Sequence, residues 1–148
     1  MKIQPKFIQE NEEWDKKSLK FFDGNIKWYD LVLDVVAFAN NKGGNIYFGI
    51  EDKAELPEEN QKFSQEWQDK WIPEIKKRVR ENTENINPLV LTVEKAQNGG
   101  EYLKIQIFAS RNSVACRSDG VYAIRFNDET HKLKPSELGH LFAEKSKN

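Results

Sequence analysis

The chain has 148 residues and a mass of 17.3 kDa, the size of one ordinary domain that can bury a hydrophobic core. Its 23 basic and 24 acidic side chains leave a net charge of -1, which excludes the overall basic excess of a generic nucleic-acid binder. Any contact with nucleic acid must therefore come from a local patch.

No apolar run in the sequence reaches the roughly 20 residues that a bilayer span needs, and the first residues lack the apolar stretch of a signal peptide. A cytoplasmic location is expected. The single cysteine, Cys116, cannot form an internal disulfide, which fits a reducing compartment. No local signature places His131 or His140 beside it, so a structural thiol is favoured over a nucleophile.

The first expected element is a short strand over residues 13–17, which places Trp14 on one face and Asp15 and Lys17 on the other. After a turn at residues 23–25, apolar side chains recur at helical spacing from Ile26 to Asn40. Because this helix is apolar almost all round, it is expected to be buried.

A tight turn at Gly43-Gly44 follows the helix, and a β-rich run over residues 45–50 predicts a buried strand that ends before Glu51 and Asp52. Helix, turn and strand together make residues 31–52 the best-specified segment of the chain. They indicate one compact domain of the α+β class.

A second helix is predicted by a stripe at every fourth position, formed by Phe63, Trp67, Trp71, Ile75 and Val79. Pro73 is expected to break it or to start a new helix, because proline lacks the backbone donor that a helix interior uses. The tryptophans have the spacing of a buried stripe, which favours core packing over base stacking.

Two hairpins are predicted in the second half of the chain. Residues 89–93 and 103–107 alternate around a turn at residues 97–100, and residues 114–117 are expected to pair with 121–126 across a turn at 118–120. Pro135 opens a final short helix. The expected fold is thus a mixed or antiparallel sheet with hairpins, packed against the buried helix of residues 26–40 and further helices.

Several common chemistries are excluded by motif. Gly44 and Gly49 have the separation of the P-loop glycines, but Ile50 and Glu51 stand where a lysine and a hydroxyl residue would bind phosphate and magnesium, so no ATP is expected. Two histidines and one cysteine argue against a zinc site, and no serine nucleophile elbow occurs.

Acidic residues remain as the candidate catalytic or metal-binding groups. The motifs that contain them resemble those of the Schlafen AlbA-like domain, found in Schlafen proteins and in many bacterial predicted DNA-binding proteins. The similar segments cover roughly residues 10–142: Glu10-x4-Asp15-x-Lys17; Ala37-Phe38-Ala39-Asn40-Asn41-Lys42-Gly43-Gly44; Ile46-Tyr47-Phe48-Gly49-Ile50-Glu51-Asp52; Ile86-x-Pro88; and Gly120-Val121-Tyr122-Ala123-Ile124-Arg125 before Thr130. Asp15 replaces the family's usual second glutamate, and Asn41 stands where threonine is favoured.

In the ribonuclease branch of that family, the resemblance implies three carboxylates that hold a divalent metal and cut structured RNA such as tRNA. Carried over, these are Glu10, Asp15 and Asp52, with Mg²⁺ or Mn²⁺ as the metal and Lys17 as a residue that steadies the phosphate. Strand parity lets only one of Glu51 and Asp52 join Asp15, and the family pattern selects Asp52. The alternative interpretation is that these acids are simply solvated.

Candidate nucleic-acid-binding cations are distributed along the chain: Lys16, Lys17, Lys20, Lys42, Lys76, Lys77, Arg78, Arg80, Arg111, Arg117 and Arg125. For residues 76–80, a solvated helix face is the alternative, since nearby glutamates dilute the charge. Arg125 alternates with Tyr122, Ile124 and Phe126 and is expected to face away from the core.

The leading hypothesis is a nucleic-acid-binding domain acting on RNA or DNA, with metal-dependent endoribonuclease activity as an extension. The alternative is a non-catalytic DNA-binding, regulatory or protein-interaction module. A homodimer is a further hypothesis by analogy, because two copies would build the two-lobed groove that tandem copies form in ribonuclease relatives.

Overall fold

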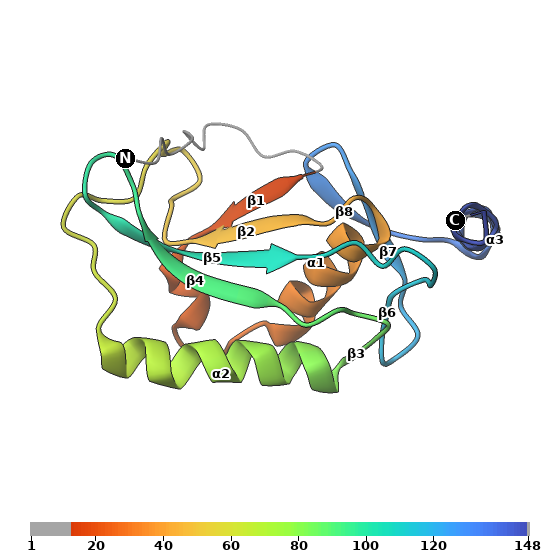
Figure 1. Ribbon diagram of the computed structural model, residues 1–148, viewed down its shortest axis with the longest axis horizontal. Coiled ribbons are helices and arrows are strands. Elements are labelled where there is room, and N and C mark those ends of the chain that lie inside the picture. Colours follow the sequence, from red (N-terminus) through yellow and green to blue (C-terminus); the bar gives the residue numbers. More distant parts are fainter. Residues whose placement is uncertain (1–12, 148) are drawn as a thin grey trace.

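The computed structural model describes residues 13–147, and these form the expected α+β fold (Figure 1). In chain order the elements are β1 (Trp14–Lys17), η1 (Leu19–Phe22), α1 (Trp28–Asn40), β2 (Gly44–Phe48), α2 (Gln65–Glu81), β3 (Thr83–Glu84), β4 (Val90–Lys95), β5 (Glu101–Ile107), β6 (Cys116–Arg117), β7 (Ala123–Phe126), β8 (Glu129–Lys132) and α3 (Pro135–Lys145). Within these residues no helix is both long and apolar enough to cross a bilayer.

The main sheet has four strands in the order β1-β2-β5-β4. β1 and β2 are parallel, and Asp15 lies opposite Ile46 in their register. The pairs β2-β5 and β4-β5 are antiparallel, and Gln106 of β5 lies opposite both Asn45 and Val90. The predicted strand of residues 13–17 and the hairpin of residues 89–107 are both confirmed.

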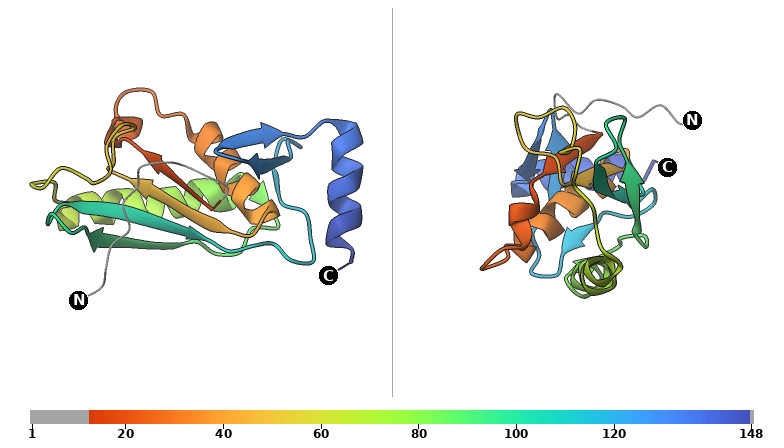
Figure 2. Two further views of the ribbon diagram at one scale, coloured as in Figure 1. Left: turned by 90° about the horizontal axis from the view of Figure 1, so that it is seen from above. Right: turned by 90° about the vertical axis from the view of Figure 1, so that its left-hand side faces the viewer.

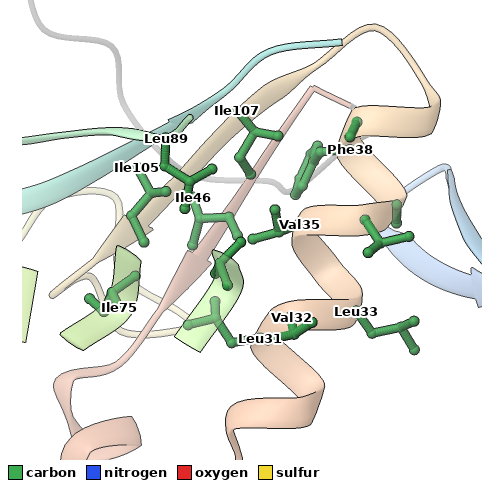
Figure 3. Close-up of a cluster of buried hydrophobic side chains, with 14 of the residues drawn as sticks. Leu31, Val32, Leu33, Val35, Phe38, Ile46, Ile75, Leu89, Ile105 and Ile107 are labelled. Carbon is green, nitrogen blue, oxygen red and sulfur yellow. The ribbon is translucent and has the colours of Figure 1, made fainter. Parts of the chain in front are cut away.

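The hydrophobic core lies between one face of this sheet and the two long helices (Figure 3). Ile46 and Ile105 project from the sheet toward Leu31 and Val35 of α1, and all four side chains are fully buried. α2 adds Ile75, which is also fully buried. The prediction of a buried first helix is confirmed, although α1 begins at Trp28 rather than Ile26.

The turn between α1 and β2 requires the glycine found there. Gly43 has a φ of +79°, in the left-handed region, and a Cβ atom at this position would lie 2.6 Å from the carbonyl oxygen of Ile107. The strand that follows is shorter than the predicted 45–50 segment, because β2 ends at Phe48 and Gly49 turns the chain with a φ of +107°. Glu51 and Asp52 therefore lie beyond the strand, where strand parity no longer applies.

The expected break at Pro73 is wrong, because α2 runs without interruption from Gln65 to Glu81. Pro73 lies on the exposed side of the helix, where water can bond the carbonyl that loses its partner. The apolar stripe on the other side continues through it. Trp67 packs partly buried against the core, with its ring 5.4 Å from that of Phe22, as core packing predicts.

The strand pairing of the second predicted hairpin is also wrong, although its turn at residues 118–120 is present, with the N–H of Gly120 bonded to the carbonyl of Arg117 at 2.8 Å. β6 pairs with β3, and β7 pairs with β8 across the two-residue turn Asn127-Asp128. Asn40, at the end of α1, stands between the two segments expected to pair and donates from Nδ2 to the carbonyl oxygens of both Ala115 (2.8 Å) and Ala123 (3.0 Å). A buried side chain thus occupies the place of a strand ladder. Figure 2 shows β7, β8 and α3 together at one end of the molecule.

Candidate functional site

A closed network of charges lies between β1 and α1. Lys17 extends its ammonium group to two carboxylates, with Nζ 2.7 Å from Oδ2 of Asp34 and 3.4 Å from Oδ2 of Asp15. Asp15 is only 7% exposed. Asp15 and Lys17 share a strand face, as parity predicted, and that face is turned toward the helix.

The network continues onto the β7–β8 hairpin. Thr130 donates its hydroxyl to Oδ1 of Asp34 (2.7 Å) and accepts a hydrogen bond from Nη1 of Arg125 (3.2 Å). The expectation that Arg125 faces away from the core is wrong. Arg125 is only 3% exposed, and its guanidinium carbon lies over the Phe38 ring, 4.6 Å from the ring centre. Ala123 and Arg125 form the inward face of β7, and Phe126 points to solvent.

Burial and ion pairing shift the pKa values of Asp15 and Lys17 in opposite directions. Burial raises the pKa of the Asp15 carboxyl, and although Lys17 opposes the shift, the neighbouring carboxylate of Asp34 adds to it. For Lys17, burial favours the neutral amine, but the carboxylates of Asp34 and Asp15 outweigh it and raise its pKa. The lysine is thus held charged by two acids that share it.

The three acids implied by the family resemblance are not assembled by the described residues. Glu10 lies outside them, and Asp52 lies in an exposed turn closed by a hydrogen bond from the N–H of Ala54 to the carbonyl of Glu51. Glu51, not Asp52, meets the end of β1, where it accepts a hydrogen bond from Ser18 Oγ (2.7 Å). Residues 13–147 contain no group of three His, Cys, Asp or Glu side chains placed to hold a metal ion.

A second feature is an open groove at the end of the main sheet where β5 ends and β4 begins. It encloses about 1080 Å³ and is lined by the α1–β2 turn and the start of β2, by residues 85–88 and Val90, and by residues 106–113. Lys42 and Arg111 line it, and both are exposed. Among the described residues that line this groove, none is acidic. We call it the basic groove.

Two smaller hollows extend the basic groove. One shares residues 85–88 with it and is lined by Lys76 and Arg80 of α2, and the other shares Lys42 and Arg111 and is lined by Lys145. Neither has an acidic side chain in its lining, in the part of the chain that the structure describes. Lys145 is buried and donates to the carbonyl of Ser110, so the exposed cations of this surface come from three separate segments. A further hollow beside Lys42 and Lys145 is lined by Glu137 and Glu144.

The other candidate cations lie elsewhere. Lys20 and Lys77 are exposed but line none of these hollows. Arg78 pairs with Glu74 at 2.7 Å, and Arg117 pairs with Asp119 at 2.8 Å. Lys16 is buried and donates to the carbonyl of Ala54 at 2.7 Å.

The walls of the basic groove are tied together by hydrogen bonds. Asn85 and Asn87 donate to the carbonyls of Val114 (3.0 Å) and Ala109 (3.1 Å), and Ser110 Oγ donates to the carbonyl of Asn85 (2.6 Å). Ser110 also bonds through its N–H to the carbonyl of Ala39 in α1 (2.8 Å). The groove is therefore preformed, with its irregular segments anchored to one another and to the core helix.

The asparagine pair Asn40-Asn41 at the end of α1 connects the groove to the closed network. Asn40 bonds the segments of Ala115 and Ala123, and Asn41 bonds the backbone of Arg125 twice, donating to its carbonyl (2.9 Å) and accepting from its N–H (3.0 Å). Asn41 is the residue that stands in place of the family's threonine. Its amide offers both a donor and an acceptor, so it clamps the β7 backbone in a two-point contact.

The comparisons with known proteins agree with this architecture. The family described as Schlafen, AlbA_2 matches residues 10–134. The chain belongs to the Schlafen AlbA_2 family. Membership supports a nucleic-acid-related function in general, and no curated protein matches the chain.

Among solved structures, the chain is similar to the crystal structure of the DIP2311 protein from Corynebacterium diphtheriae, with a TM-score of 0.59 and 17% sequence identity. The match covers 91% of this chain and 27% of that one. At this identity the likeness shows a shared fold. The chain corresponds to about a quarter of the DIP2311 protein's length.

Asp34 of the closed network was missed from the sequence, and Thr130 was named only as the residue that follows a family-like segment. Asp34 is an acidic residue within an otherwise apolar stretch of helix, which is a signal that it needs a partner when the helix is buried. Thr130 gives no such signal, because threonine is ordinary in a strand. The groove-lining asparagines also went unnoticed, since they lie in segments without regular periodicity.

Proposed function

We propose that this Schlafen AlbA_2 domain binds nucleic acid along the basic groove. The observation that carries the proposal is that the groove and its two extensions place the exposed cations Lys42, Arg111, Lys76 and Arg80 on one surface whose described lining has no acid. In a chain of net charge -1, such a segregated surface is the local patch that contact with phosphates requires.

Phosphate contacts predict a defined salt dependence. Each cation that neutralises a phosphate releases a condensed counterion, so the logarithm of affinity falls linearly with the logarithm of salt concentration. The side chains of Lys42 and Arg111 are exposed at the groove surface, where a polyanion can reach them. By contrast, Lys17 and Arg125 are held inside the protein.

Fluorescence anisotropy across a salt series tests this proposal, with single-stranded RNA and duplex DNA as probes. The double variant Lys42→Glu, Arg111→Glu is expected to lose at least about 10-fold in affinity and to lower the salt slope by about 2. The matched control is Lys53→Glu, Lys95→Glu, which makes the same charge change at exposed positions outside the groove. Equal losses in both double variants overturn the proposal, and no binding by the unaltered protein at low salt favours a protein-interaction module.

Metal-dependent cleavage of structured RNA such as tRNA is a second candidate function. It is favoured by the closed network, where Asp15 and Asp34 approach the same ammonium group and burial raises the pKa of Asp15, a pattern found at functional sites. Glu10 and Asp52 are needed to complete the carboxylate set. A bound Mg²⁺ or Mn²⁺ would supply activation of water and compensation of phosphate charge.

Incubation of the purified protein with tRNA and Mn²⁺ tests cleavage, beside the triple variant Glu10→Ala, Asp15→Ala, Asp52→Ala. Because Asp15 is buried, a second variant, Glu10→Gln, Asp52→Asn, leaves the closed network intact. Cleavage that is lost in both variants supports the ribonuclease function. Equal cleavage by all three proteins, or none, removes it and leaves the binding proposal standing.

Pairing of two copies into a larger groove is a further part of the proposal, resting on analogy with tandem relatives. Light scattering measures the mass of the protein with and without tRNA. A protein mass of twice the chain mass in either sample, after the mass of the RNA is subtracted, supports pairing. A single-chain mass in both samples contradicts it.

A further inference from the structure

The lining of the basic groove includes apolar surface in addition to cations. Phe108 and Val90 line it, and each is 43% exposed. Phe108 directly follows Ile107, which is 2% exposed, so the chain leaves the core and presents an aromatic ring at the next residue. Phosphate binding does not require either side chain. Their exposure points to a ligand with an apolar face.

We infer that the basic groove takes unpaired bases, so that its ligand is single-stranded nucleic acid with a base stacked on Phe108. This inference rests on the proposed binding function and adds the class of nucleic acid. Aromatic rings stack on any base, and surrounding cations track the backbone. Lys42 and Arg111 line the same groove as Phe108, which supplies both parts of such a site.

Amide side chains add groups suited to base edges. Asn45 and Gln106 lie opposite each other on β2 and β5, and both line the groove with Asn112. The amides of Gln106 and Asn112 carry donors and an acceptor without net charge, so they can bond the exposed edge of an unpaired base, whereas Oδ1 of Asn45 is buried. Val90 lies opposite Gln106 on the other side of β5. The basic groove therefore combines amide, apolar and cationic side chains in one lining.

The concave shape also favours a single strand over a duplex. Direct readout of B-form DNA in the major groove uses a protruding helix or β-ribbon. Here the surface is hollow, and its walls are strand ends and loops held by hydrogen bonds from Asn85, Asn87 and Ser110. A duplex keeps its bases stacked inside, so it would leave Phe108 and Val90 without a partner.

Anisotropy with a 12-nucleotide single-stranded RNA, its 12-base-pair duplex and an abasic strand of equal length tests the inference. Phe108→Ala is expected to weaken single-strand binding about 10-fold with an unchanged salt slope, because stacking is lost and the phosphate contacts remain. Phe108→Ala and the unaltered protein should have equal affinity for the duplex, and equal affinity for the abasic strand. Phe108→Tyr should restore single-strand binding. The matched control is Phe126→Ala, which removes a ring that is 63% exposed and lies outside the groove.

The outcomes separate this inference from the binding proposal. If the Lys42→Glu, Arg111→Glu variant loses affinity and Phe108→Ala does not, nucleic-acid binding stands and base stacking is overturned. Equal affinity of the unaltered protein for the single strand and the duplex also overturns the inference. If neither set of variants loses affinity, both proposals fail.

Discussion

Two sets of cations in this domain have opposite surroundings. In the closed network, Lys17 lies between Asp15 and Asp34, and Arg125 is buried over Phe38. In the basic groove, Lys42 and Arg111 are exposed beside polar and apolar side chains, without an acid in the described lining. The surroundings of a lysine or arginine, and not its presence in a basic stretch of sequence, therefore decide whether it can bind a ligand.

The same contrast assigns different roles to the two regions. Removing a partner from the closed network leaves a buried charge uncompensated, so the cost falls on stability. Changing an exposed groove cation leaves the packing intact, so the cost falls on binding. Stability and affinity measurements on matched variants can therefore test the two regions independently.

The largest expected effect comes from Asn40, which holds both regions in place. Asn40→Ala leaves the N–H and carbonyl of Ala115 and the carbonyl of Ala123 without their side-chain partner, and it should lower the free energy of unfolding by about 4 kcal/mol. Urea denaturation measures it. The control is Asn98→Ala, which also loses two backbone hydrogen bonds but at an exposed site, so a smaller loss is expected. Equal losses would contradict the role of burial.

The next effect breaks the closed network alone. Asp34→Ala removes the carboxylate that accepts from both Lys17 and Thr130, and it should cost about 3 kcal/mol of unfolding free energy. Asp34→Asn keeps an acceptor for Thr130 and should cost less. In a double-mutant cycle, adding Lys17→Met to Asp34→Ala should cost less than the sum of the two single losses. Additive losses would show that the two side chains are not coupled.

The groove variants should have almost no effect on stability. Lys42→Glu with Arg111→Glu is expected to change the free energy of unfolding by less than about 0.5 kcal/mol, because both side chains are exposed. Thermal and urea unfolding measure it on the same preparations used for binding. A loss comparable to that of Asp34→Ala would mean that the groove cations are structural and would remove the contrast between the regions.

The smallest effect is a pH dependence that isolates Asp15. Since burial raises the pKa of this carboxyl above its ordinary value of 3.8, the folded state binds the proton more tightly than the unfolded chain. Stability from this group is therefore present below pH 3.8 and is lost as the pH rises through the folded pKa. Asp15→Asn should lack this decline, measured as a difference in urea unfolding across the acid range.

Asp119 provides the opposite control for that measurement. The guanidinium of Arg117 lowers the pKa of the Asp119 carboxyl, so its contribution is present above pH 3.8 and is lost as the pH falls through the folded pKa. The difference between the unaltered protein and Asp119→Asn should therefore change with pH in the opposite sense. The same sign for both variants would contradict the assignment of the Asp15 shift to burial.

Most of the regular structure could be predicted because its signals are local. The apolar spacing of α1, the glycine at position 43 and the alternation of β4 and β5 each depend on residues close in sequence. The site was harder to predict. Lys17 and Asp34 belong to different elements, β1 and α1, and the alternation around Arg125 is the same whichever face of β7 is buried. Periodicity shows that two faces differ, but it does not show which one the rest of the protein covers.

Local spacing and short ordered segments of sequence are sufficient to specify the α+β class, the buried first helix, the Gly43 turn and membership of the family. Contacts between distant segments were needed to establish that Asn40 separates the expected hairpin strands, that Arg125 turns inward, and that Lys42 and Arg111 share a groove with Phe108. Each depends on which distant segments meet. Buried polar groups such as the amide of Asn40 need partners, and those partners come from distant segments that no local window contains.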